Sequence, residues 1–160
     1  MGAMLAKGPG VADSLEAEAL ACRRALEFAM DIGFSKLVIE GDCVQVINAI
    51  NSNKANLSWL GLVYEDIQVL ISGLRWAEVH WVKRSANLVA HSLAHNAENI
   101  SDDVIWLEDS PPPALDALYH DSLSIIKWNL VPVSKKKKKS GWNGFENLQA
   151  LFIWIFCMFA

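Results

Sequence analysis

The chain has 160 residues, of which 52% are hydrophobic and 20% charged, and its formal net charge at pH 7 is −4. A chain of this length suits one domain of ordinary size. Five of the 14 basic residues form a lysine run at 135–139, so residues 1–134 hold 9 basic against 17 acidic residues, a net charge of −8. This excludes binding of nucleic acid through a broad basic field, and any such contact must be local or assisted by a metal ion.

The cysteines and the N-terminus indicate an intracellular, nuclear or cytoplasmic location. Cys22, Cys43 and Cys157 are odd in number and show no CxxC spacing, which favours neither a disulfide framework nor a zinc ribbon. The first ten residues, MGAMLAKGPG, contain no apolar run of signal-peptide length.

The first predicted helix follows the Gly-Pro turn near the N-terminus. Asp13 with Glu16 three residues later is typical of a helix start, and apolar residues then recur at steps of three and four from Leu15 up to Gly33. Glu18 flanks this apolar stripe, so we expect its carboxylate to point along the edge of the core.

The segment 36–42, KLVIEGD, predicts the central strand of the domain. Three consecutive apolar residues are typical of a strand buried on both faces. Gly41 lets the chain turn and places Asp42 at the carboxyl end of the strand, where α/β proteins hold their functional groups. The alternative for Asp42 is a purely structural role, because Asp42 with Gln45 also matches a capping box.

The next elements alternate between helix and strand. A short helix is predicted over 44–50, marked by Val44, Ile47 and Ile50, and a longer one over 57–72. Aromatic and β-branched residues predict a second strand over 76–82, and a basic connection then leads to a helix over 88–99. This succession indicates an α/β layer in which the two strands are parallel.

Two strands make a sheet with open edges. We therefore expect that the first strands of a larger fold are absent, and that the chain self-associates through an open edge.

The C-terminal part differs in composition from the rest. We expect a domain over 1–123 and a poorly ordered tail over 124–160, which holds the lysine run and the apolar residues 148–160. The apolar end has thirteen residues, fewer than the roughly 20 that span a bilayer, so a membrane role is not expected. It is a membrane-surface segment, a buried helix or a segment without selected structure, and we favour the last.

Three segments in this order carry a family resemblance: SLEAEALACRRALEFAMDIGF, KLVIEGDCVQVINAI and VHWVKRSANLVAHSLAH. Together they resemble the ribonuclease H type 1 fold, and in particular the plant reverse-transcriptase-like domains of retroelement origin. The resemblance covers about residues 3–123. It implies an α/β ribonuclease H-like fold with an incomplete mixed sheet that lacks the first N-terminal strands.

The resemblance also implies a site. In that family, four carboxylates hold two Mg²⁺ ions at the scissile phosphate of an RNA–DNA hybrid. Glu18 matches the helix glutamate and Asp42 the aspartate after the central strand, while the family's first aspartate has no counterpart here. His91 stands at the position of the last aspartate, where an imidazole suits Mg²⁺ poorly.

Three further residues are implied to contact nucleic acid. Lys83 and Arg84 lie in a loop that would meet phosphate, and Asn87 matches a family position near the substrate strand. The alternatives are a solvated turn for Lys83 and Arg84 and a helix N-cap for Asn87.

The resemblance therefore predicts a nucleic-acid-binding domain with RNA–DNA hybrid endonuclease activity that uses Mg²⁺ and no small-molecule cofactor. The missing carboxylates predict that this activity is degenerate. The alternative is a non-catalytic module that binds nucleic acid or protein. A zinc enzyme based on His91 and His95 is a further alternative, but Ser92 replaces the glutamate of an HExxH motif. We expect His80 and His120 to be structural.

Overall fold

A computed structural model of the chain describes residues 2–11, 13–52, 57–97, 99–120 and 151–154, the last of these by their backbone. In the described part, the α-helices are α1 (Ser14–Asp31), α2 (Val44–Ile50), α3 (Trp59–Ser72) and α4 (Leu88–Ala97). The strands are β1 (Gly2–Leu5), β2 (Lys36–Gly41), β3 (Trp76–Trp81), β4 (Val104–Leu107) and β5 (Leu151–Trp154). Two short 3₁₀ helices, η1 (Arg84–Ala86) and η2 (Pro112–Ala114), are also present, and residues 115–120 directly after η2 are helical.

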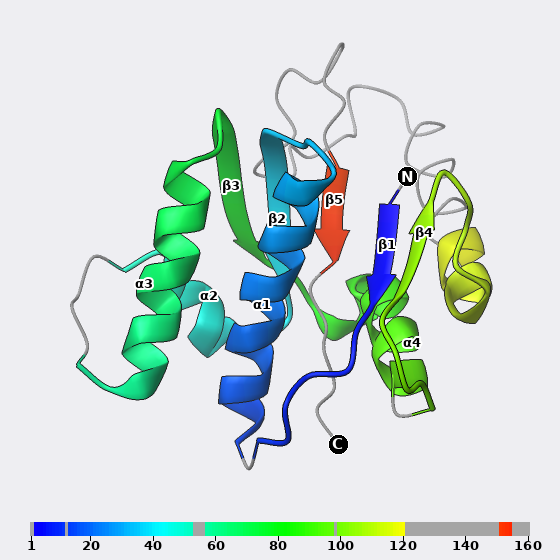
Figure 1. Cartoon of the computed structure of the whole chain (residues 1–160), viewed down its shortest axis with the longest axis horizontal. Helices are drawn as coiled ribbons and strands as arrows, with labels where there is room; N and C mark the ends of the chain where they lie inside the picture. Colours follow the sequence, from blue (N-terminus) through cyan, green and yellow to red (C-terminus); the bar gives the residue numbers. More distant parts are fainter. Residues whose placement is uncertain (1, 12, 53–56, 98, 121–150, 155–160) are drawn as a thin grey trace, which may run out of the picture.

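The strands lie side by side in the order β3, β2, β5, β1, β4 (Figure 1). Backbone hydrogen bonds join them as two sheets, β3–β2–β5 and β1–β4. In the larger sheet, β2 pairs in parallel with β3, and Lys36 lies opposite Trp76. The predicted parallel pairing of the two central strands is thus confirmed, and β2 is the middle strand of its sheet.

The free edge that the sequence suggested for β2 is occupied. Strand β5 pairs in parallel with β2, and Leu151 lies opposite Leu37. None of the three structures expected for 148–160 was a strand of the sheet. The physical reason is that an unpaired edge of a buried strand exposes backbone donors and acceptors, which a distant apolar segment can satisfy. Residues 124–150 and 155–160 of the expected tail lie outside the described residues.

Strand β1 was too short to identify from sequence, and it owes its pairing to β4. The two strands are antiparallel, with Ala3 opposite Trp106 and Leu5 opposite Val104. These four side chains belong to a small apolar cluster with α4 and the segment around η2, which also includes Val89, Leu93, Ala97, Ala114 and Ala117.

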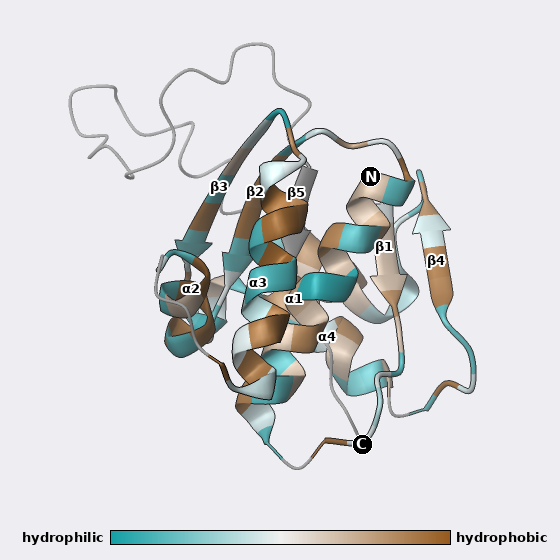
Figure 2. Cartoon of the chain, turned by 60° about the vertical axis from the view of Figure 1, so that its left-hand side comes forward, coloured by the Kyte–Doolittle hydropathy of each residue, from teal (hydrophilic) through white to brown (hydrophobic). Residues whose placement is uncertain are grey.

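The main core lies between α1, β2, α2 and α3. It is built around fully buried side chains that include Leu26, Leu37, Ile39 and Ile67. Hydrophobic and hydrophilic residues alternate along α1 and α3, as expected for helices with one buried face (Figure 2). In α2 the inward face carries Val46, Ile47 and Ile50, whereas Val44 is 50% exposed. Within the described residues, no helix has the length and apolar character needed to cross a membrane.

Candidate active site

An open pocket of about 440 Å³ lies where three segments meet: the start of α1, the turn from β2 to α2, and η1. It contains the carboxylates of Glu18 and Asp42, and we call it the carboxylate pocket. Its lining residues are Asp13, Ser14, Leu15, Glu18, Asp42, Cys43, Gln45 and Arg84. The structure therefore brings together the two carboxylates that the sequence placed on separate elements.

Glu18 is positioned by the first turns of α1. The side chain of Asp13 caps this helix by accepting a hydrogen bond from the backbone N–H of Leu15 at 2.9 Å. One turn further, Ala19 and Cys22 are fully buried against the core. Glu18 is only partly buried and reaches the pocket from the edge of that buried face, as its spacing predicted.

Asp42 is positioned by the end of β2. Cys43, and not Asp42, is the N-cap residue of α2, so the capping interpretation of Asp42 is wrong. The turn is held from β3 instead: the indole Nε1–H of Trp81 donates to the carbonyl oxygen of Asp42 at 3.0 Å, and the N–H of Val82 donates to the carbonyl oxygen of Gly41 at 3.0 Å. These bonds leave the Asp42 carboxylate available to the pocket.

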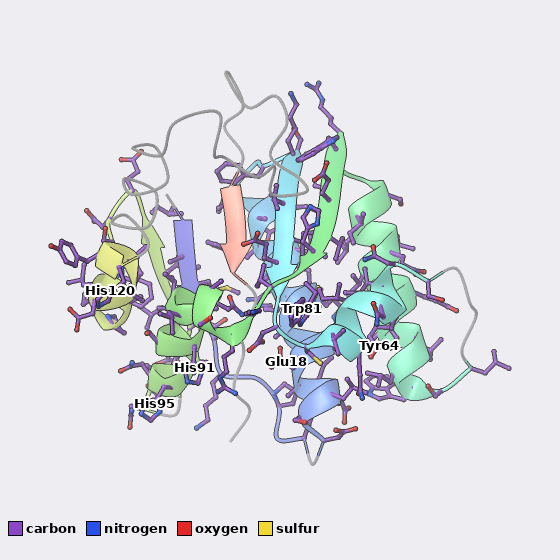
Figure 3. All side chains as sticks on the ribbon, turned by 180° about the vertical axis from the view of Figure 1, so that it is seen from behind. Glu18, Tyr64, Trp81, His91, His95 and His120 are labelled. Carbon is purple, nitrogen blue, oxygen red and sulfur yellow. The ribbon has the colours of Figure 1, made fainter. Side chains whose placement is uncertain are left out.

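Trp81 is a positioning residue that the sequence did not identify. The aromatic and β-branched residues around it predicted only a strand, and the structure shows that the Trp81 side chain is exposed and hydrogen-bonded. Figure 3 labels Trp81 and Glu18 at the same end of the sheet.

The pocket changes the proton affinity of Glu18. Burial, followed by the negative charge of Asp42, raises the pKa of Glu18 from 4.5 to about 7, and the positive charge of Arg84 acts in the opposite direction. Burial is also the main cause that raises the pKa of the nearby Cys22 thiol to about 12, with the charge of Glu18 second. Near neutral pH, the Glu18 carboxyl is thus shared between its charged and neutral forms.

Arg84 is the basic residue of the pocket lining, and His91 lies beside it. The Nη2 atom of Arg84 is 3.1 Å from Nδ1 of His91 and 3.4 Å from its Nε2. His91 itself, on α4, is not among the residues that line the pocket. Lys83 is exposed next to Arg84 and is also outside the lining.

Asn87 is fully buried, and neither its side-chain nitrogen nor its side-chain oxygen has a hydrogen-bond partner. Its backbone carbonyl accepts from the N–H of His91 at 3.0 Å, which opens α4. Asn87 thus stands at the start of the helix without using its side chain as a cap. In this conformation the amide does not reach solvent.

The fit to metal ions can be judged from the donors present. In the described part of the chain, no group of three or more His, Cys, Asp or Glu side chains is arranged to hold a metal ion. The pair His91 and His95, considered for zinc, therefore has no third ligand among these residues. Of the three acidic residues that line the pocket, Asp13 uses a carboxylate oxygen to cap α1, so Glu18 and Asp42 offer two uncommitted carboxylates next to a guanidinium. Mg²⁺ prefers an octahedron of oxygen ligands, so this donor set does not fit a pair of Mg²⁺ ions.

Several lining residues were not predicted as part of a site. Asp13 was expected only as a helix cap, and Gln45 only as the capping-box partner of Asp42, yet both line the pocket. The one signal in the sequence was that Asp13, like Glu18, lies at the start of the first helix. In the fold this end of α1 lies next to the end of β2, so both residues reach the pocket.

Comparison with solved structures agrees with this architecture. The chain is similar to the crystal structure of RNase H1 from the halophilic archaeon Halobacterium salinarum NRC-1, with a TM-score of 0.51 and 27% sequence identity over 55% of this chain and 67% of that one. A search of curated proteins finds no significant match. The mixed α/β architecture and this likeness define a ribonuclease H-like fold.

The sequence comparison gives the family. Residues 1–97, more than half of the chain, match the model of the reverse transcriptase-like family. The chain belongs to this family, and a nucleic-acid-related function of the ribonuclease H kind follows from that membership.

Proposed function

We propose that the domain binds RNA–DNA hybrids at the carboxylate pocket and that its endonuclease activity is degenerate. The supporting observation is the convergence of Glu18 and Asp42, from α1 and the end of β2, in one open pocket. In the related family, these two positions act on the hybrid. The fold explains why they meet here, because the helix and the strand end face the same edge of the sheet.

The number of carboxylates is the reason for weak hydrolysis. A pair of metal ions lowers the barrier by activating the attacking water and stabilising the leaving oxygen together. Two carboxylates, one of them partly protonated at neutral pH, compensate the charge of two divalent ions poorly. Bound hybrid should therefore be cleaved slower by orders of magnitude than by a complete site.

Binding itself should rely on few charges. Lys83 and Arg84 are exposed neighbours after β3, within a region of net charge −8. With about two phosphate contacts, the slope of log K against log salt concentration should be about −2. Affinity should thus be modest and sensitive to salt.

The test uses a labelled RNA–DNA hybrid and the full chain. Fluorescence anisotropy measures binding, and gel analysis measures cleavage in Mg²⁺ and in Mn²⁺. Asp42→Asn removes one carboxylate of the pocket, and Asp31→Asn is the matched control, since Asp31 is exposed at the opposite end of α1. We expect binding with little cleavage, and loss of any remaining cleavage in Asp42→Asn alone.

Two outcomes would contradict the proposal. Efficient metal-dependent cleavage that disappears in Asp42→Asn would show an active nuclease, and the absence of hybrid binding would favour a module that binds protein. His91→Asp places a carboxylate at the position where the family has one. If this variant raises cleavage, the histidine is a limiting loss, and the degenerate assignment is strengthened.

A further inference from the structure

The basic side chain of the carboxylate pocket is that of Arg84, and its surroundings differ from those of Arg23 and Arg24. Arg23 and Arg24 form ion pairs with Asp66 and Asp103 at 3.2 Å. In the described part of the chain, Arg84 forms no ion pair within 4.0 Å, although its charge is close enough to Glu18 to lower the pKa of that carboxyl. Its guanidinium therefore lines the pocket without a direct ion-pair partner among the described residues.

His91 orients this guanidinium. An arginine can only donate, so a ring nitrogen of His91 that bonds to Arg84 is the acceptor of that bond. As an acceptor, the imidazole fixes the position of the guanidinium without cancelling its charge. Arginine has five N–H donors in a rigid fork, and those not directed at His91 remain available to the pocket.

The location of Arg84 suits a phosphate group. The residue lies on η1, directly after β3, and lines the same open pocket as Asp42. A guanidinium binds phosphate through paired, charge-assisted hydrogen bonds. A cation already resident beside two carboxylates also disfavours the entry of divalent ions by simple repulsion.

We propose that Arg84, oriented by His91, binds one phosphate of the nucleic-acid backbone directly, so that the pocket takes an RNA–DNA hybrid without a divalent metal ion. This inference rests on the proposed function, because it assigns the contact through which the same pocket holds the hybrid. Arg84 is the binding residue, and His91 is a positioning residue that acts through it.

The experiment measures anisotropy of a labelled RNA–DNA hybrid with the full chain, in excess EDTA and in millimolar Mg²⁺. The dissociation constant should be the same in both buffers to within about twofold, because no metal contact contributes to binding. Arg84→Ala should weaken binding by about tenfold and reduce the salt slope by about 1. Arg84→Lys should recover the slope and only part of the affinity, because it keeps the charge and loses the fork.

The matched control is Arg75→Ala. Arg75 is also exposed, and it precedes β3, whereas Arg84 follows it, so the two arginines lie at opposite ends of the same strand. His91→Ala should weaken binding by about threefold with an unchanged salt slope, because it loosens the guanidinium without removing a charge. His91→Gln, whose amide oxygen can accept from Arg84, should restore the affinity.

The outcomes separate this inference from the proposed function. Absence of hybrid binding in both buffers would refute the proposed function. Binding that requires Mg²⁺ would leave the proposed function standing and refute the role of Arg84, as would equal effects of Arg84→Ala and Arg75→Ala. Circular dichroism of each variant verifies folding, and Arg84→Lys decides the question if Arg84→Ala does not fold.

Discussion

Removing the ionisable group of Glu18 should stabilise the fold at high pH. The pKa of Glu18 is raised from 4.5 to about 7, mainly by burial and secondly by Asp42. The folded state therefore binds the proton more tightly than the unfolded state does. The associated stability is fully present below about pH 4.5 and is lost as the pH rises through about 7.

The size of the effect follows from the two pKa values. The interval from 4.5 to about 7 corresponds to about 3 kcal/mol in the free energy of unfolding above pH 7. Glu18→Gln carries no charge at any pH. Its gain over the wild type should thus be near zero at pH 4.5 and should grow to about 3 kcal/mol above pH 7.

Urea denaturation followed by circular dichroism, at several pH values between 4.5 and 8, measures this difference. Glu65→Gln is the control, because Glu65 is exposed on α3. Asp42→Asn should give a smaller gain than Glu18→Gln, since Asp42 is only the second cause of the raised pKa. A difference in the free energy of unfolding between Glu18→Gln and wild type that does not change with pH would refute a raised pKa caused by burial of Glu18.

Two further expectations concern the core and the sheet edge. Asn87→Asp should lower the free energy of unfolding by about 3–5 kcal/mol at neutral pH, because Asn87 is fully buried and a charge there would have no partner. Thermal denaturation of this variant is compared with that of Asn87→Ala. A loss for Asn87→Asp no larger than that for Asn87→Ala would contradict this. The full chain should also self-associate through β4, which among the described strands pairs with β1 alone and exposes Ile105 (51%) and Leu107 (54%). Light scattering should show larger species for the wild type than for Ile105→Lys. A monomeric wild type at tens of micromolar would contradict self-association through β4.

Local patterns in the sequence determined much of the domain. The three- and four-residue spacing from Leu15 gave α1, and the apolar run after Lys36 gave the buried strand β2. The same patterns placed Glu18 at the edge of a buried face and Asp42 at a strand end, so both residues of the carboxylate pocket could be selected before the fold was known. These predictions succeed because they depend on neighbours within a few residues.

Contacts between distant segments decided the rest. Asp42 with Gln45 matches a capping box, yet Cys43 occupies the N-cap position of α2 and makes no side-chain cap hydrogen bond. The turn is bonded instead to the indole of Trp81 on β3. The pairing of β5 with β2 likewise joins segments more than 100 residues apart.

The charge balance of the pocket was also beyond local reasoning. Arg84 and His91 were predicted as residues of a basic loop and a helix. Their contact arises because α4 packs against η1, and the opposing effects of Asp42 and Arg84 on Glu18 arise because η1 lines the same pocket as α1. Electrostatic energies depend on distance and burial in three dimensions, and neither quantity is encoded in the spacing of residues along the chain.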